Sequence, residues 1–393
     1  MSLTVLEATK LSSFEHFKLV AGHRGLDRII QKVGILDWEF AKNFEGETVD
    51  SEFIQGEFIL SSLMFAKDNP ELLIEMLQHL EANDVAGMAI KDVYYQTFPE
   101  EVLRFAEEHA FPIFIFSTTY FEDIIMQVNE RIKSINDYES LETKVDLLVK
   151  MHLNKAMVRD VALEINSSFR ECLFVLYLKE KRFVSEDRLI SAIQNLRNSK
   201  IVGPADAMIK YRQGLLLIYT DDKLDQVAYQ KKVKYIMGTA NLHLEGYYVG
   251  ISNLHADTRS SLSDLGYGLC ESLFASNTAE VTGKDCCYFK EIGIHSILMP
   301  FHKDIWFHNW YDSIINPIIR HDEKYNTELL ATALKFIEND GKVPETARAM
   351  FIHKNTIRYR LNKIKEILEM EDSNLDFMEQ LSVAIKLHKI YHL

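Results

Sequence analysis

Basic and hydrogen-bonding side chains are concentrated in one short stretch near the end of this chain. Residues 342–365 contain seven Lys or Arg and a single acid, Glu345, so their formal charge is +6. The whole chain carries −14, which leaves −20 for all other residues. Because a polyanion attracts a localised basic patch and is repelled by acidic surface, this stretch has the electrostatics of an element that binds nucleic acid.

The residue types in this stretch also suit DNA recognition. Amide and hydroxyl groups read base edges, and Arg or Lys binds guanine or phosphate oxygens. The candidate DNA-binding residues are His353, Lys354, Asn355, Thr356, Arg358, Tyr359, Arg360, Lys363 and Lys365. The first four begin a predicted helix, where base edges are reached, and the later basic residues are better placed for phosphates. Alternatively, Asn355 or Thr356 only caps the start of that helix.

Two short helices joined by a tight turn would position these side chains. Pro344 can open the first helix because its missing N–H lies among the donors left free there. Ala347 is small where two helices must approach closely. A helically spaced apolar stripe, bent once at the turn, consists of Met350, Ile352, Ile357, Leu361 and Ile364. The pattern is typical of a helix-turn-helix, and its alternative is a solvated basic helical hairpin.

The same residues resemble a known family. Residues 352–361, preceded by Thr346 and Ala347, are similar to the C-terminal signature of purine-catabolism regulator (PucR)-type transcription factors, a domain shared with sugar-diacid regulators. Residues 328–334 resemble the helix before that signature, and residues 384–390 the closing helix. Phe351 departs from helix-turn-helix units in general, where Gly or a small residue is usual at the turn.

Residues 1–120 predict an α/β domain with a largely parallel sheet, because short apolar strands alternate with amphipathic helices. A strand is expected over residues 28–36. Gly22, Gly25 and residues 56–60 resemble the N-terminal domain of the same family. With no Gly-rich phosphate loop, nucleophile elbow or metal-ligand cluster, we expect no catalytic residue, cofactor or metal here. Side chains that could line an effector pocket at strand ends are Glu57, Ser61, Ser62 and Asp92.

Residues 121–160 predict one continuous helix that links this domain to the next. Its apolar stripe runs from Ile125 to Leu148 with three- and four-residue spacing. Such a stripe is either the seam of a coiled-coil dimer or a face that packs against the chain's own domain.

Residues 161–282 predict a β-α-β-β-α-β order, with strands near 172–178, 207–212, 215–220 and 245–251. This is the split β-α-β layout of nucleotide cyclases, and it resembles the degenerate, GGDEF-like middle domain of the regulator family. A cyclase needs metal-binding acids at the end of its first strand and on its hairpin. At those places this sequence has Leu178–Lys179 and residues 211–214, which include no acid. We therefore expect a non-catalytic scaffold.

The remaining residues predict a connector (283–320) and the helix-turn-helix domain (321–393). Four cysteines without paired spacing indicate reduced thiols, and no apolar run reaches the roughly 20 residues that span a bilayer. The chain is thus expected to be a cytoplasmic, effector-responsive DNA-binding regulator of nitrogen or carbon catabolism, acting as a homodimer or higher oligomer. The rival readings are a cyclase or phosphodiesterase, and a ligand-binding protein that does not bind DNA.

Overall fold

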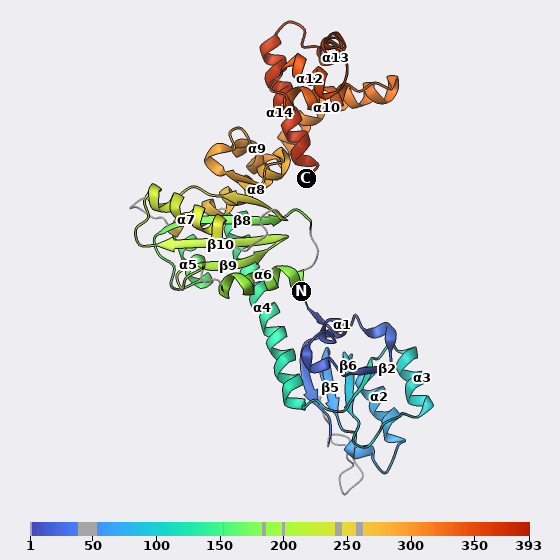
Figure 1. Ribbon diagram of the computed structural model, residues 1–393. Coiled ribbons are helices and arrows are strands. Elements are labelled where there is room, and N and C mark those ends of the chain that lie inside the picture. Colours follow the sequence, from blue (N-terminus) through green and yellow to red (C-terminus); the bar gives the residue numbers. More distant parts are fainter. Residues whose placement is uncertain are drawn as a thin grey trace. The chain divides into compact units, whose positions relative to one another are not determined.

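The computed structural model describes residues 2–37, 53–151, 153–182, 186–198, 201–239, 246–256 and 262–393. The chain forms two compact units, Met1–Ser140 and Leu141–Leu393, and Figure 1 shows the elements of each. The described elements are mixed α/β in the N-terminal and middle regions and helical toward the C-terminus. No helix among these residues is both long and apolar enough to cross a membrane.

The N-terminal unit is built on a sheet in the order β2-β7-β6-β5-β4. Strands β4 to β7 run parallel to their neighbours, and β2 is antiparallel to β7, so the expected largely parallel sheet is confirmed. The strands are β2 (Lys18–Ala21), β4 (Lys32–Ile35), β5 (Glu57–Ser61), β6 (Gly87–Lys91) and β7 (Ile113–Phe116). The helices are α1 (Val5–Ala8), α2 (Leu72–Ala82) and α3 (Glu100–Glu108).

Strand β5 is buried along its whole length because both faces of the sheet are covered. Ile59 packs with Leu73 and Leu77 of α2 on one face. Phe58 and Leu60 face the other side, where they join a separate cluster. This arrangement explains why β5 reads as a continuous apolar run and not as an alternating one.

The strand expected over residues 28–36 is in fact two strands. β3 (Ile29–Ile30) pairs with β1 (Leu3–Thr4) in a small sheet of its own, whereas β4 pairs with β5. Between them, the N–H of Gln31 donates to the carbonyl of Gly56 (2.7 Å). This change of partner depends on tertiary contacts, and the apolar pattern of the sequence does not predict it.

The prediction of one continuous helix over residues 121–160 is wrong, because two helices lie here. α4 (Phe121–Lys150) ends, and α5 (Lys155–Ile165) begins at a new N-cap. The side chain of Asn154 accepts a hydrogen bond from the N–H of Met157 (3.0 Å), which starts a second helix without any Gly or Pro.

The apolar stripe of α4 is covered by the chain itself, so the coiled-coil seam is also wrong. Val128 and Ile135 are buried in the core of the N-terminal unit. Val145 and Leu148 are buried in the core beneath the middle sheet. The side chains of this stripe already lie in two cores of the chain, and apolar residues outside the stripe, such as Met126 and Leu147, are the exposed ones.

We expect Val145→Ala to lower the free energy of unfolding by about 2 kcal/mol, since Val145 is fully buried and the change leaves a cavity. Leu147→Ala is the matched control on the same helix, where the side chain is 36% exposed, and should cost far less. Urea unfolding of both variants at several protein concentrations measures this. A loss that depends on protein concentration would instead place Val145 between chains.

The middle sheet has the order β12-β11-β8-β10-β9 and is antiparallel except between β11 and β12. All four predicted strands are present, although Glu245, the expected start of the last one, lies outside the described residues. The strands are β8 (Cys172–Glu180), β9 (Ala207–Tyr211), β10 (Gly214–Asp221), β11 (Tyr247–Ile251) and β12 (Cys286–Tyr288). The helices are α6 (Glu186–Asn198), α7 (Gln226–Thr239) and α8 (Leu265–Thr282). All four cysteines are free thiols.

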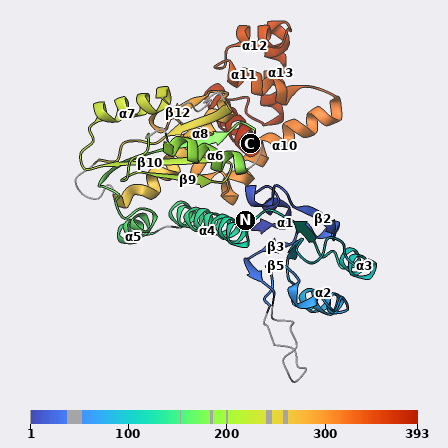
Figure 2. The same ribbon diagram turned by 60° about the horizontal axis from the view of Figure 1, so that its bottom comes forward.

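The C-terminal helices share one hydrophobic core, which includes Ile315, Phe336, Ile357 and Ile385. Figure 2 shows α10 to α13 grouped in this part of the chain. The helices are α9 (His295–Phe301), α10 (Ile305–Tyr325), α11 (Leu329–Glu338), α12 (Val343–Ala349), α13 (Lys354–Ile367) and α14 (Asn374–Tyr391). As expected, α11 stops before a glycine, since Gly341 adopts a positive φ of 71°.

Candidate nucleic-acid interface

The predicted helix-turn-helix is formed by α12 and α13. Pro344 lies in the first turn of α12, as expected. The turn is closed by hydrogen bonds from the N–H of Met350 to Thr346 (3.0 Å) and from the N–H of Ile352 to Ala347 (3.1 Å). Phe351 occupies the left-handed position between them, with φ of 56°. The residue that departs from the usual pattern therefore adopts the backbone conformation that normally favours glycine.

One face of α13 is fixed in the domain core. Ile357 and Ile364 are fully buried, and Leu361 is 7% exposed. Ala347 of α12 is also buried, which lets the two helices approach closely. Burial of these side chains at three- and four-residue spacing holds the helix in one rotational setting and determines which residues face outward.

Five of the nine candidate residues lie on the outward face of α13 with no side-chain hydrogen bond or ion pair to the described residues. These are Lys354, Asn355, Thr356, Arg358 and Tyr359, and all are exposed. Within the part of the chain that the structure describes, the side chains of Lys354 and Arg358 make no hydrogen bond or ion pair. Their charges are thus available to an external anion.

His353 is the N-cap of α13. Its Nδ1 accepts a hydrogen bond from the N–H of Asn355 (3.2 Å). The interpretation of Asn355 or Thr356 as the cap is therefore wrong, and both side chains are left to face outward. An imidazole acceptor was not predicted here, because Ser, Thr, Asp and Asn are the usual caps.

Arg360 is turned inward, unlike its neighbours. Its side chain is 20% exposed, and its Nη1 donates to the carboxylate of Glu328 (3.1 Å) and to the hydroxyl of Thr332 (3.0 Å), at the start of α11. Arg360 therefore joins the two helices. Neither partner was predicted from sequence, and their separation of about thirty residues gives no local signal.

Lys363 and Lys365 also contact their own domain. Lys363 pairs with Glu366 (2.7 Å), and this hydrogen bond raises the pKa of the ammonium group. Lys365 donates to Asn374 (2.7 Å) and lies 5.1 Å from the centre of the Phe377 ring. Lys363 sits in an exposed ion pair that an incoming phosphate can replace.

Ion pairs lower the effective charge of residues 342–365 below +6. Four of the seven basic residues lie within 4 Å of a carboxylate. The pairs are Lys342 with Asp340, Arg348 with Glu345, Arg360 with Glu328, and Lys363 with Glu366. Three of these acids lie outside the counted stretch, so a charge count along the sequence overestimates the local field.

An open groove of about 900 Å³ runs beside the outward face of α13. Thr356, Tyr359 and Lys363 line it from α13, and Tyr325 and Thr327 line it from the α10–α11 junction. At this junction the carboxylate of Asp322 accepts hydrogen bonds from the N–H groups of Leu329 (2.8 Å) and Leu330 (2.9 Å), which caps α11. The wall opposite α13 is thus held in place by the hydrogen bonds of Asp322.

Three of the four residues predicted to line an effector pocket lie at one edge of the sheet of the N-terminal unit. Ser61 and Ser62 lie at the carboxyl end of β5, where both hydroxyls and the N–H of Ser62 donate to Asp37. Asp92 follows β6 and accepts from Ser117 (2.6 Å). Glu57, in contrast, is the first residue of β5, at the opposite end of the strand, so its place in this pocket is wrong.

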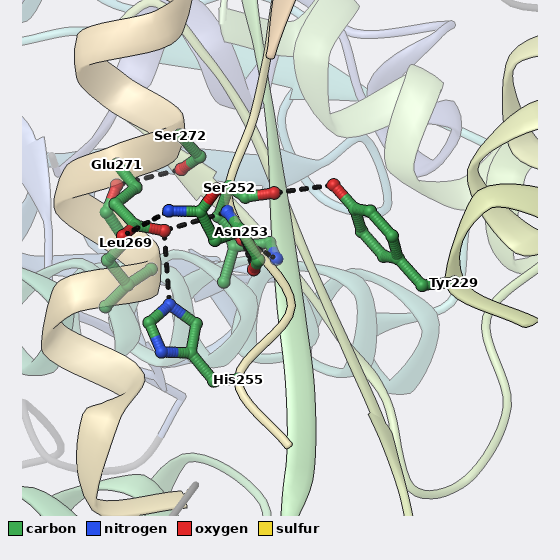
Figure 3. A network of polar contacts seen from close by, with 8 residues as sticks. Tyr229, Ser252, Asn253, His255, Leu269, Glu271 and Ser272 are labelled. Carbon is green, nitrogen blue, oxygen red and sulfur yellow. Dashed lines mark hydrogen bonds and ion pairs between the residues drawn. The ribbon is translucent and has the colours of Figure 1, made fainter. Parts of the chain in front are cut away.

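A polar network in the middle region has the composition of a catalytic cluster but ties two elements together. The carboxylate of Glu271 on α8 accepts from the N–H and amide of Asn253 (2.8 and 3.0 Å) and contacts Nε2 of His255 (3.1 Å). Figure 3 shows these groups converging on Glu271, beside a bond from the Tyr229 hydroxyl to the carbonyl of Ser252 (2.7 Å). The carboxylate thereby anchors the chain after β11 to α8.

The end of the first middle strand differs from expectation. β8 extends to Glu180, whose N–H donates to the carbonyl of Gln213 in the hairpin (2.9 Å), so an acid does stand at this place. Its side chain is 2% exposed and lies 3.8 Å from Arg188. Among the described residues, no three His, Cys, Asp or Glu are grouped as metal ligands would be.

Phe351→Gly should raise the free energy of unfolding of the C-terminal region by about 0.5–1 kcal/mol, since the Cβ strains the left-handed backbone. The ring is 96% exposed, so little packing is lost. Phe351→Ala is the control, because it removes the ring and keeps the strained Cβ. Thermal unfolding that finds the two variants equally stable would contradict strain at this turn.

Comparison with known proteins identifies two of these regions. Residues 7–132 match the purine catabolism regulatory protein-like family, and residues 329–387 match the PucR C-terminal helix-turn-helix domain.

Three relatives cover different shares of the chain. The purine catabolism regulatory protein of Bacillus subtilis (strain 168) is 28% identical over 28% of this chain and 20% of its own length. The proline-responsive transcriptional activator PutR of the same organism is 29% identical over 36% and 34%. The carbohydrate diacid regulator of Escherichia coli (strain K12) is 29% identical over 30% and 32%. The chain spans about a fifth to a third of the length of these relatives.

Proposed function

We propose that this chain, a PucR-type protein by both its N-terminal domain and its C-terminal helix-turn-helix, is a transcriptional regulator that reads duplex DNA with α13. The observation that carries the proposal is the division of α13 into two faces. One face is locked into the core by Ile357, Leu361 and Ile364. The other face presents Lys354, Arg358 and several hydrogen-bonding groups over about one and a half turns of helix, and these two cations have no ion pair with the described residues. An exposed helix face of this kind fits a major groove.

The nine candidate residues take three different roles in this proposal. Lys354, Asn355 and Thr356 stand in the first turn of α13 and reach base edges, where an Asn recognises adenine and a Lys recognises guanine. Arg358, Tyr359, Lys363 and Lys365 bind phosphate oxygens. His353 and Arg360 support the reading helix, the first as its cap and the second as its tie to α11.

The other regions serve this output. We assign residues 1–120 to a regulatory domain that responds to an unidentified small molecule, 121–160 to a linker, 161–282 to a degenerate cyclase-like scaffold, 283–320 to a connector and 321–393 to the DNA-binding domain. The scaffold assignment is supported by the β-α-β-β-α-β order. The chain would act in the cytoplasm as a homodimer on a two-fold symmetric operator, in a nitrogen or carbon catabolic pathway, as the names of its relatives suggest.

Non-catalytic behaviour of the middle region follows from its hairpin. Residues 211–214 carry no acid, and the nearby carboxylate of Glu180 is enclosed beside Arg188. Two carboxylates of α4 reach the hairpin, but Glu142 accepts from the N–H of Arg212 (2.9 Å) and Asp146 from the hydroxyl of Tyr211 (2.6 Å). These acids are engaged by the hairpin itself and are not grouped as the oxygen ligands of a divalent cation, which phosphoryl chemistry needs. Purified protein should therefore not cyclise GTP or ATP with magnesium or manganese. Turnover well above a heat-denatured control would refute the scaffold assignment.

Two arginines on α13 give a sharp test of DNA reading. Arg358→Ala should weaken binding to all duplexes and lower the slope of log affinity against log salt by about 1, because one phosphate contact is lost. Arg360→Ala should instead cost stability, about 1–2 kcal/mol, because it removes the charged hydrogen bonds to Glu328 and Thr332. Fluorescence anisotropy across a salt series and thermal unfolding separate the two effects.

Unchanged affinity and salt slope for Arg358→Ala would exclude this face of α13 from the interface. Absence of any salt-sensitive duplex binding by the wild-type protein would favour the rival reading, a ligand-binding protein whose basic helix meets an acidic partner.

A further inference from the structure

Helix α9 is apolar on two faces, although a surface helix usually has one. Leu298 and Met299 point into the C-terminal core and are nearly fully buried. Ile294, Ile297 and Phe301 follow one another at three- and four-residue spacing and are 38%, 54% and 52% exposed. A helix that is apolar all round is normally covered on all sides. Here Phe301 lies against the ring of Phe307 (centroids 5.9 Å apart), yet Ile294, Ile297 and Phe301 all remain exposed among the described residues.

Two more exposed apolar side chains lie in the first turn of α10, directly after α9 in the chain. Ile305 is 62% exposed and Trp306 is 78% exposed. The two helices are joined closely, since the N–H of Asp304 donates to the carbonyl of Phe301 (2.8 Å). We call Ile294, Ile297, Phe301, Ile305 and Trp306 the α9–α10 patch.

The patch has the composition of a protein interface. Its five side chains are all apolar and between 38% and 78% exposed. Residues 292–307 contain only one Lys and one acid, and the interior of an interface is likewise poor in charge. An exposed Trp is also the residue type that most often dominates binding energy.

The few charges at the patch favour a second copy of the same surface. Lys303 and Asp304 stand side by side in the loop between α9 and α10, and both are exposed. In a two-fold contact, each surface meets itself, so a neighbouring pair of opposite charges can face the reversed pair of its partner. A strongly acidic or basic partner would find no matching field here.

The patch is also rigidly connected to the reading helix. Tyr311, Ile315 and Ile318 of α10 lie in the same core as Ile357 and Leu361 of α13. A dimer formed through α10 therefore fixes the distance between two copies of α13. Fixed spacing is what paired half-sites one helical turn apart demand of a helix-turn-helix protein.

We propose that the α9–α10 patch is the homodimer interface, formed with a second copy of this chain, and that it sets the spacing of the two reading helices. The operator geometry in this inference rests on the proposed DNA-binding function. The dimer itself does not, and it is measured without DNA.

The test compares matched substitutions of exposed apolar residues in the full chain. Ile297→Glu places two charges in the two-fold contact and should give a monomer where the wild type is a dimer at micromolar concentration. Val227→Glu, on α7, is the control, because that side chain is similarly exposed at 59% but lies outside the patch. Sedimentation velocity measures the masses, and circular dichroism checks that each variant is folded. Trp306→Ala, which adds no charge, should raise the dimer dissociation constant at least tenfold.

A DNA arm separates this inference from the proposed function. On a duplex with two half-sites selected by the wild-type protein, Ile297→Glu should bind at least 100-fold more weakly, because the second contact is no longer intramolecular. Its affinity for a single half-site should stay within twofold. Loss of single-site binding in Arg358→Ala tests the reading helix alone.

A wild-type protein that is monomeric at all concentrations would overturn the dimer. A dimer that Ile297→Glu and Trp306→Ala leave intact would place the interface on another surface. Either result leaves the assignment of α13 to DNA unaffected.

Discussion

The burial of one apolar stripe on α13 is the constraint on which the rest of the C-terminal region depends. Ile357, Leu361 and Ile364 leave the helix no freedom to rotate, and each is worth on the order of 1.5–3 kcal/mol when removed from water. In the proposed function, α13 must present the same side chains to every operator, so its orientation has to be held by the domain before DNA arrives. The core built by α10, α11 and α14 supplies that hold.

The polar contacts around α13 refine the same constraint. Arg360 donates hydrogen bonds to Glu328 and Thr332, and these bonds fix α13 against the start of α11. His353 closes the N-terminus of the helix, which releases Asn355 and Thr356 for other contacts. As a result, fewer cations of α13 are available to bind an external anion. Lys354 and Arg358 are the two that have no hydrogen bond or ion pair with the described residues. Basic residues that look equivalent in the sequence therefore serve opposite purposes, some holding the helix and others facing outward.

The two apolar surfaces considered for self-association illustrate why burial has to be known. The stripe of α4 looks like a coiled-coil seam, but Val128 and Val145 each belong to a core of their own chain. The residues of the α9–α10 patch keep helical spacing only within α9, so their sequence pattern does not predict an interface. In the structure, however, a Trp and three Ile of this patch are exposed. Spacing shows that side chains share a face, whereas only the fold shows what lies against that face.

The sequence alone determined the local features of this protein. Residues 344–365 indicated two helices, a turn and a buried stripe, because helical periodicity, Pro at a helix start and charge clustering act over a few residues. The α/β order of the N-terminal and middle regions was readable for the same reason. Tertiary structure alone decided the exchange of partners between β3 and β4, the break after Lys150, the inward turn of Arg360 and the place of Glu180 beside the hairpin. Apart from the break after Lys150, which the local cap Asn154 marks, each of these depends on groups brought together from distant parts of the chain. Contacts of that kind leave no spacing that a linear pattern can record.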